Sequence, residues 1–263
     1  MSSTLVKLGH ALVAGYVGLC AWGAHAARRT TYVPQAVQGF RREPDFTLTR
    51  EGVAVRGWVA HGDRSDAVLY FHGNASRAED RLDDTAPELP DQALYLPAYR
   101  GYGPSGGEPS ERALVADALA LYDEVAPSYR TVSVVGRSLG SAVAVQVAAA
   151  RPVHRLVLVT PFDSAAGIAG ELLPILPWRL LLRDPYESRR WAARVRCPIL
   201  VVRGSDDRVI TPARTAALVA ALRVPPEEVV LVGRQHSDVQ DDPAYFAAIR
   251  RFLGADGGDA AAG

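Results

Sequence analysis

The stretch VVGRSLGSAV, residues 134–143, decides the fold, because it places Gly136-Arg137-Ser138-Leu139-Gly140 between a β-branched apolar run and a run of small apolar residues. A serine between glycines at a strand-to-helix junction is typical of a nucleophile on a strained turn, where the glycines relieve crowding. The following helix would direct the partial positive charge of its N-terminus toward that serine. The pattern predicts that Ser138 is a nucleophile, if the rest of the chain supplies a base and an acid.

Length and composition favour one globular domain with a large core. The chain has 263 residues, of which 48% are hydrophobic, and α/β folds of this size usually form a single domain. Basic and acidic residues balance at 29 each, and no basic stripe is present, which argues against a nucleic-acid partner. Lys7 is the only lysine and alanine is abundant, a bias that suggests a GC-rich bacterial genome.

No cofactor or metal is expected from the sequence. Two cysteines, Cys20 and Cys197, supply neither a disulfide framework nor a four-cysteine zinc site. The glycines at positions 101, 103, 106 and 107 do not form the G-x-G-x-x-G fingerprint that opens a helix after a strand.

Residues 8–27 form an N-terminal run without Asp, Glu, Lys or Arg. A run of this length can cross a bilayer core as a helix, and we expect residues 1–29 to be a membrane anchor whose orientation the flanking charges leave undetermined. Ala24-His25-Ala26 also has the form of a signal-peptidase site. Two alternatives therefore stay open, a cleaved signal that leaves a secreted or periplasmic protein and a merely apolar helix.

Short apolar runs alternate with helical patterns in the rest of the chain. Two stretches around Arg50-Glu51-Gly52 predict an opening hairpin over 46–49 and 53–60. Alternating strands and helices predict a mostly parallel sheet with helices on both faces, whose ligands bind at the carboxyl ends of the strands. The expected strands cover 67–73, 93–100, 131–137, 155–161, 198–204 and 228–233, and the expected helices 111–125, 141–150, 212–222 and 243–253.

The combination of motifs resembles the α/β-hydrolase superfamily over about residues 30–253. Within it the chain is similar to the small membrane-anchored BEM46-like group, with the ABHD13 and ABHD17 types as relatives. The motifs are Phe71-His72-Gly73-Asn74, Tyr99-Arg100-Gly101-Tyr102-Gly103-Pro104-Ser105-Gly106, Gly136-Arg137-Ser138-Leu139-Gly140, Gly204-Ser205-Asp206-Asp207 and His236.

The resemblance implies a catalytic triad. A serine hydroxyl needs an imidazole to accept its proton and a carboxylate to orient that imidazole. The chain order of α/β-hydrolases, serine, acid and histidine, implies Ser138, Asp207 and His236, and each follows an expected strand. Asp206 remains an alternative to Asp207, and Asp238 is a weaker one.

The other histidines are less suitable as the base. His72 precedes a glycine in an oxyanion loop, where histidine is usually structural; His61 lies in an expected turn, and His154 begins a strand. The loop around His236 departs from the family, because Arg234-Gln235-His236-Ser237 replaces the usual Gly-x-Gly-His-Asn-Asp.

Two backbone N–H groups are expected to form the oxyanion hole. One belongs to Leu139, directly after the nucleophile, and the other to Asn74, in the loop after the first long parallel strand. The glycine-rich stretch from Arg100 to Gly106 is expected to support this region.

The segment between the expected strands at 155–161 and 198–204 is the place where α/β-hydrolases carry a cap. We expect a short cap over about 162–196, and its apolar residues either line an acyl pocket, touch a membrane or pack as an ordinary helix. A compact cap suits a small acyl ester or thioester, and a lipid ester is among the candidate substrates. The expected domain covers 30–253, followed by a disordered tail over 254–263. Two other functions stay open, a serine peptidase for short peptides and a non-catalytic binding protein with this fold.

Overall fold

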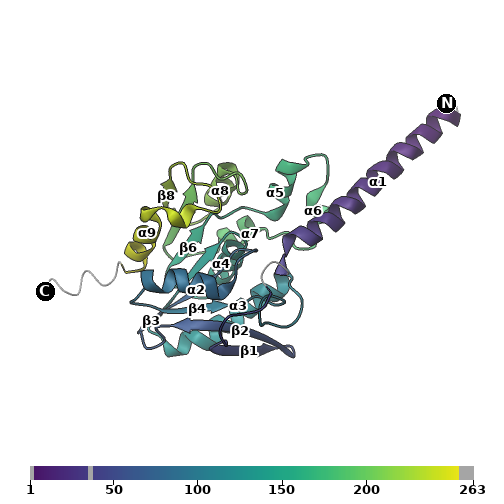
Figure 1. Cartoon of the computed structure of the whole chain (residues 1–263). Helices are drawn as coiled ribbons and strands as arrows, with labels where there is room; N and C mark the ends of the chain where they lie inside the picture. The colour runs from purple at the N-terminus through teal and green to yellow at the C-terminus, as the bar shows by residue number, and fades with distance from the viewer. Residues whose placement is uncertain (1–2, 35–37, 255–263) are drawn as a thin grey trace.

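A computed structural model describes residues 3–34 and 38–254 (Figure 1), and within them the strands form one eight-stranded sheet in the order β1-β2-β4-β3-β5-β6-β7-β8. β2 is antiparallel to β1 and β4, and the pairs from β4 through β8 are parallel. The strands are β1 (Phe46–Arg50), β2 (Val53–Ala60), β3 (Asp66–Phe71), β4 (Ala93–Pro97), β5 (Thr131–Arg137), β6 (Leu156–Val159), β7 (Ile199–Gly204) and β8 (Glu227–Leu231).

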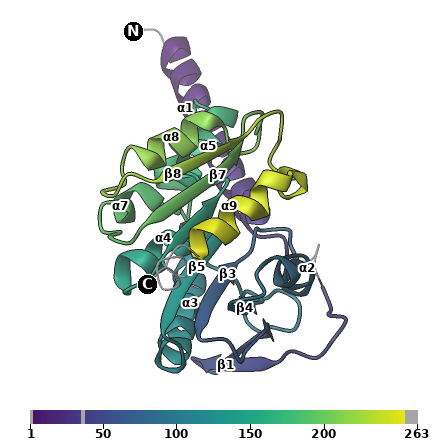
Figure 2. The same ribbon diagram turned by 90° about the vertical axis from the view of Figure 1, so that its left-hand side faces the viewer.

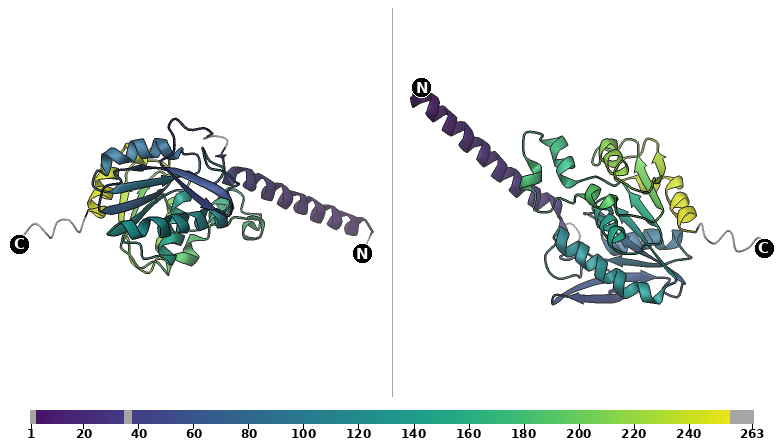
Figure 3. Two further views of the ribbon diagram at one scale, coloured as in Figure 1. Left: turned by 90° about the horizontal axis from the view of Figure 1, so that it is seen from below. Right: turned by 180° about the vertical axis from the view of Figure 1, so that it is seen from behind.

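Helices cover both faces of the sheet (Figures 2 and 3). Buried residues of α3, α4, α7 and α8 join one core cluster, and those of α2 and α9 join the cluster on the opposite face. The predicted fold class is therefore confirmed. The helices are α1 (Ser3–Thr31), α2 (Ala78–Thr85), α3 (Glu111–Val125), α4 (Leu139–Ala150), α5 (Ala165–Leu172), α6 (Trp178–Leu181), α7 (Ser188–Ala192), α8 (Pro212–Val219) and α9 (Pro243–Leu253), with the short 3-10 turns η2 (Ala86–Glu88), η3 (Ala126–Ser128) and η4 (Val239–Asp241).

The opening hairpin forms where the sequence predicts it. Arg50 pairs with Val53, and the two residues between them, Glu51 and Gly52, have φ values of 53° and 72°. Two consecutive left-handed residues are the requirement of a two-residue hairpin turn that matches the twist of the strands. Gly52 accepts this conformation without a Cβ penalty.

The buried strands form because their side chains are apolar on both faces. Every residue of β6 is buried, and β7 is buried except for Arg203. Strands covered by helices on both sides require such continuous apolar runs. The predicted helix over 141–150 begins two residues earlier, at Leu139, so Ser138 directly precedes the first helical residue.

The N-terminal run is helical but does not meet the requirements of a membrane span. α1 protrudes from the body of the protein (Figure 1) and contacts it near α6. No helix in the described part of the chain is long and apolar enough to cross a membrane. The predicted membrane anchor over 1–29 is therefore not supported, and the physical reason is that glycines and two histidines, His10 and His25, interrupt the apolar run.

The segment 162–196 contains α5, α6 and α7 and lies between β6 and β7. It is the segment for which the sequence predicted a cap. The predicted tail over 254–263 falls, except for Gly254, outside the described residues.

Candidate active site

Ser138 lies on a strained turn between β5 and α4. Its φ and ψ are 51° and −117°, a combination that a residue with a side chain rarely adopts. The N–H of Ser138 donates to the Val159 carbonyl of the neighbouring strand at 2.9 Å. The turn is thereby fixed to β6, and the serine is presented at the carboxyl edge of the sheet.

The two glycines of the motif are required by close backbone contacts. A Cβ on Gly140 would lie 1.9 Å from the carbonyl oxygen of Phe71, and a Cβ on Gly136 would lie 2.4 Å from the carbonyl oxygen of Gly140. Any side chain at these positions would force α4 away from β3 or β5. The glycines allow the helix to begin directly beside the strands.

Ser138, His236 and Asp207 form one chain of hydrogen-bonding distances. His236 Nε2 lies 3.0 Å from Ser138 Oγ, and His236 Nδ1 lies 2.8 Å from Asp207 Oδ2. The Asp207 side chain is 2% exposed and that of His236 18% exposed. Because a carboxylate only accepts, Nδ1 carries the proton in this arrangement and Nε2 is free to accept one from the serine.

The structure distinguishes the two adjacent aspartates. The exposed Asp206 accepts a hydrogen bond from Ser205 Oγ at 2.7 Å. Asp207 is buried, and its Oδ1 accepts from the N–H groups of Val209 and Ile210, each at 2.8 Å. These two bonds leave Oδ2 directed at His236, so Asp207 is the aspartate with the required position.

The loop that carries His236 is held by polar contacts that the sequence reasoning missed. The guanidinium of Arg137 donates to the carbonyls of His236 and Ser237 at 3.2 and 3.4 Å, and the N–H of Gln235 donates to Asp238 Oδ1 at 2.6 Å. Arg137 is the first of the two variable residues of the Gly-x-Ser-x-Gly motif, and the pattern itself specifies no residue type there. Asp238, the weaker candidate for the acid, instead caps its own loop.

The loop after β3 lies against Ser138. A Cβ on Gly73 would lie 3.6 Å from the Cβ of Ser138. The next residue, Asn74, accepts from the Tyr102 hydroxyl at 2.5 Å and from the Val33 N–H at 3.2 Å through its side-chain oxygen. Its side-chain amide donates to the Thr30 carbonyl at 3.3 Å. The side chain of Asn74 is thus occupied in holding the loop, and only its backbone N–H is left for the predicted oxyanion role.

Leu139 occupies the position that the oxyanion prediction requires. It is the first residue of α4, and the first N–H groups of a helix have no partner within the helix. The same helix end carries partial positive charge. The oxyanion roles of Leu139 and Asn74 remain predictions.

His72 has a structural environment. Its ring is fully buried, lies 4.2 Å from the ring of Tyr99, and donates from Nδ1 to the Gly73 carbonyl at 2.8 Å. Burial lowers the pKa of His72 to about 4, so the ring is neutral near pH 7. His61 contacts the carbonyl of Ala86, and His154 lines a cavity with Asp66 at the amino end of β3.

No metal site was found among the residues that the structure describes. No group of three or more His, Cys, Asp or Glu side chains in residues 3–34 and 38–254 is arranged to hold an ion. Burial raises the pKa of the Cys197 thiol to about 11, which keeps it protonated and unreactive near neutral pH.

Comparisons with known proteins agree with this architecture. A protein of Mycobacterium tuberculosis described as uncharacterised is 36% identical and shares 92% of either chain. The alpha/beta hydrolase domain-containing protein WAV2 of Arabidopsis thaliana is 29% identical over 68% of this chain and 66% of its own length. The alpha/beta hydrolase domain-containing protein 17B of Xenopus laevis is 27% identical over 59% of this chain and 54% of its own length.

Solved structures resemble the fold at low sequence identity. The structure of Est1E from Butyrivibrio proteoclasticus with bound ferulic acid has a TM-score of 0.68, is 15% identical, and covers 79% of this chain and 97% of its own. The model of the alpha/beta hydrolase family matches residues 60–197, which is more than half of the chain. The chain therefore belongs to the alpha/beta hydrolase family, as the motifs predicted.

Proposed function

We propose that the protein is a serine hydrolase that cleaves a carboxylic ester or thioester through an acyl-enzyme on Ser138. The observation that carries this proposal is the unbroken contact from Ser138 Oγ through the His236 ring to Asp207, with distances of 3.0 and 2.8 Å. This arrangement supplies a nucleophile, a base and an orienting carboxylate.

In the first half of the reaction, Ser138 Oγ attacks the carbonyl carbon while His236 Nε2 takes the hydroxyl proton. The negative charge that develops on the carbonyl oxygen is stabilised by the N–H groups of Leu139 and Asn74 and by the N-terminus of α4. The C–O or C–S bond then breaks, and the leaving alcohol or thiol takes the proton from His236. Asp207 stabilises the imidazolium and keeps it oriented.

In the second half, water replaces the leaving group. His236 removes a proton from the water, the resulting hydroxide attacks the acyl carbon, and the bond to Ser138 Oγ breaks as the serine regains its proton. The products are a carboxylic acid and an alcohol or thiol.

A fluorophosphonate probe tests the nucleophile. We expect the wild-type protein to be labelled and Ser138→Ala to lose labelling and hydrolysis together. Circular dichroism of the variant controls for folding. Labelling that persists in Ser138→Ala, or a folded wild type that is never labelled, would contradict the proposal, and the latter result would favour a non-catalytic binding protein.

A pair of substrate classes tests the reaction. We expect p-nitrophenyl esters and acyl thioesters to be hydrolysed, and aminoacyl p-nitroanilides to be cleaved poorly. Efficient cleavage of the anilide would instead support a peptidase, because only a peptidase must expel a poor amine leaving group.

A further inference from the structure

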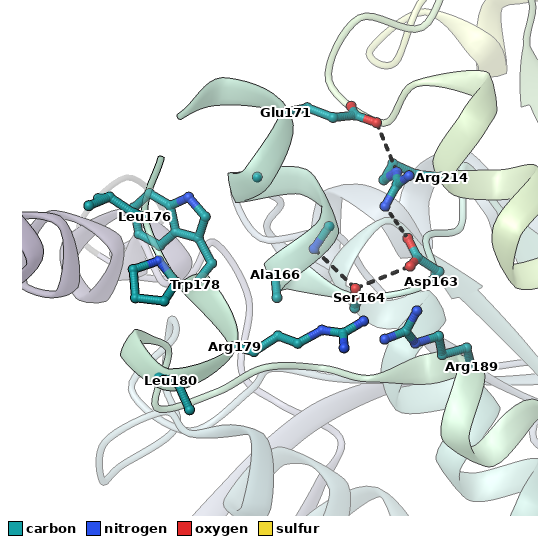
Figure 4. Close-up of a pocket in the computed structure, with 13 residues that line it drawn as sticks. Asp163, Ser164, Ala166, Glu171, Leu176, Trp178, Arg179, Leu180, Arg189 and Arg214 are labelled. Carbon is teal, nitrogen blue, oxygen red and sulfur yellow. Dashed lines mark hydrogen bonds and ion pairs between the residues drawn. The ribbon is translucent and has the colours of Figure 1, made fainter. Parts of the chain in front are cut away.

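A cavity with a volume of about 590 Å³ lies in the segment proposed as the cap. Its lining comes from the loop after β6, from α5, α6 and the loop between them, and from single residues of α7 and α8 (Figure 4). The lining contains three arginines and two carboxylates, together with the side chains of Leu176, Pro177, Trp178 and Leu180. The cavity is therefore a mixed one, charged on one side and apolar on the other.

The cavity lies on the side of the sheet that carries the proposed triad. Val159, at the end of β6, accepts the hydrogen bond of the Ser138 N–H, and the chain enters the cavity lining four residues later, at Asp163. Arg214 comes from α8, which follows the Asp207 loop. Ser138, Asp207 and His236 do not line the cavity themselves, so a substrate would reach it with a part that extends beyond the reacting carbonyl, along the loop after β6.

Arg214 forms ion pairs with both carboxylates that line the cavity. It contacts Asp163 at 3.3 Å and Glu171 at 2.8 Å. Gly167 makes room for it, because a Cβ there would lie 2.3 Å from Arg214 Nη1. Asp163 is almost fully buried, and an uncompensated buried carboxylate would be costly. Arg214 thus has a structural role.

Arg179 and Arg189 have no such carboxylate partner in the part of the chain that the structure describes. Figure 4 shows their guanidinium groups extending toward one another beside Ser164, one from α6 and the other from α7. Neither has an ion-pair partner among residues 3–34 and 38–254. The backbone N–H of Arg189 donates to the Asp163 carbonyl at 3.1 Å, which holds the start of α7 against the cavity. Two guanidinium groups that face each other repel, and an anion between them would relieve the repulsion.

Apolar residues on both sides of Arg179 in α6 suggest what kind of ligand carries the anion. The Trp178 indole N–H donates to the Leu173 carbonyl at 2.8 Å, so its ring is held in place. Leu180 is 85% exposed although it lines the cavity. An exposed leucine beside these two guanidinium groups is suited to a ligand with both a hydrocarbon part and a negative charge.

We propose that Arg179 and Arg189 form an anion subsite that binds a carboxylate or phosphate group of the substrate, with adjacent hydrocarbon against Trp178 and Leu180. The inference rests on the proposed ester or thioester hydrolysis and narrows its substrate to acyl compounds that carry a second, anionic group. Guanidinium groups bind both kinds of oxyanion through paired hydrogen bonds.

Matched esters test the subsite. The p-nitrophenyl half-esters of succinate, adipate and suberate are compared with the p-nitrophenyl esters of butyrate, hexanoate and octanoate, which have the same chain lengths without the second carboxylate. In Arg179→Gln/Arg189→Gln, we expect kcat/KM for the best half-ester to fall about tenfold or more through KM. The neutral ester of that length should change less than twofold.

Two further variants control for charge and geometry. Arg190→Gln removes a positive charge from α7, the helix that also carries Arg189. Arg190 pairs with Glu187 outside the cavity lining, so this variant should leave the preference for the half-ester over the neutral ester unchanged. Arg179→Lys/Arg189→Lys keeps both charges and should retain part of the preference for the half-ester that the double glutamine variant loses. An equal change for charged and neutral esters in the glutamine variant would overturn the subsite.

Two other measurements separate the failure of the subsite from that of the proposed function. Fluorophosphonate labelling of Ser138 should be equal in the wild type and the glutamine variant, because the probe carries no second anion. If the wild type is not labelled, hydrolysis fails as a function, and calorimetric binding of adipate against hexanoate still decides the subsite. Adipate and inorganic phosphate are then tested as competitors of the half-ester, and the one that competes identifies the kind of anion that the subsite binds. If neither competes, the inference is overturned.

Discussion

Arg137, the last residue of β5, and His236, in the loop after β8, are joined by a hydrogen bond of 3.2 Å from the guanidinium to the His236 carbonyl. The same guanidinium contacts the carbonyl of Ser237. The residue directly before the proposed nucleophile therefore holds the backbone of the proposed base. A charged donor on a backbone carbonyl is one of the stronger hydrogen bonds in proteins.

Arg137→Met tests this positioning role. We expect kcat to fall about tenfold with little change in KM, because the loop would hold the His236 ring less well while substrate contacts stay intact. Arg137→Lys should recover part of kcat, since lysine supplies one donor. A fall in melting temperature without any change in kcat would show that Arg137 supports only the fold.

Substitution of Asp207 or Asp206 by asparagine tests which of the two aspartates orients the His236 ring. Asp207→Asn keeps the size of the side chain but can present an N–H to His236 Nδ1, which favours the wrong tautomer. The corresponding change in a serine protease lowers kcat roughly 10⁴-fold, and we expect a loss of that order in ester hydrolysis. Asp206→Asn is the matched control, and the assignment fails if it is the more damaging variant.

Gly140→Ala should destabilise the protein strongly. The added Cβ would lie 1.9 Å from a backbone oxygen, and overpacking of this kind costs about 1–3 kcal/mol or more. In Gly170→Ala the nearest atom, Trp178 Cδ1, would lie 4.0 Å away, so a helical alanine should be neutral or stabilising by up to about 1 kcal/mol. Urea unfolding of both variants checks the prediction, and equal stabilities would contradict it.

The buried His72 predicts a loss of stability in mild acid. The unfolded chain accepts a proton near pH 6.5, whereas burial lowers the pKa of the folded protein to about 4. The contribution of His72 to stability is therefore complete above pH 6.5 and declines as the pH falls toward 4. Each pKa unit corresponds to about 1.4 kcal/mol, so the total loss is about 3 kcal/mol.

His72→Phe is the variant that tests this effect. It retains a ring against Tyr99 but cannot be protonated. The difference in unfolding free energy between wild type and variant should shift in favour of the variant between pH 6.5 and 4. Parallel profiles over this range would show that His72 does not titrate in this way.

Local signals were enough for the fold and for the strained turn at Ser138. The strand, Gly-x-Ser-x-Gly and helix of residues 131–150 are contiguous, so the turn at Ser138 could be predicted from spacing alone. The hairpin around Glu51 and Gly52 was predictable for the same reason, since two residues between β-rich runs restrict the turn. The predicted membrane anchor over 1–29 was not supported, because glycines and two histidines interrupt the apolar run, and its length alone did not reveal this.

By itself, the sequence determined the alternation of strands and helices along the chain, the turn that presents Ser138 and the family. Only the tertiary structure placed Asp207, and not Asp206, against His236 and revealed the hydrogen bonds from Arg137 to the His236 loop. It also left Arg179 and Arg189 without acidic partners among residues 3–34 and 38–254. The physical reason is the separation along the chain between the residues that interact. Backbone conformation follows from neighbouring residues, whereas the direction of a carboxylate or a guanidinium depends on contacts between segments brought together by the packing of the sheet.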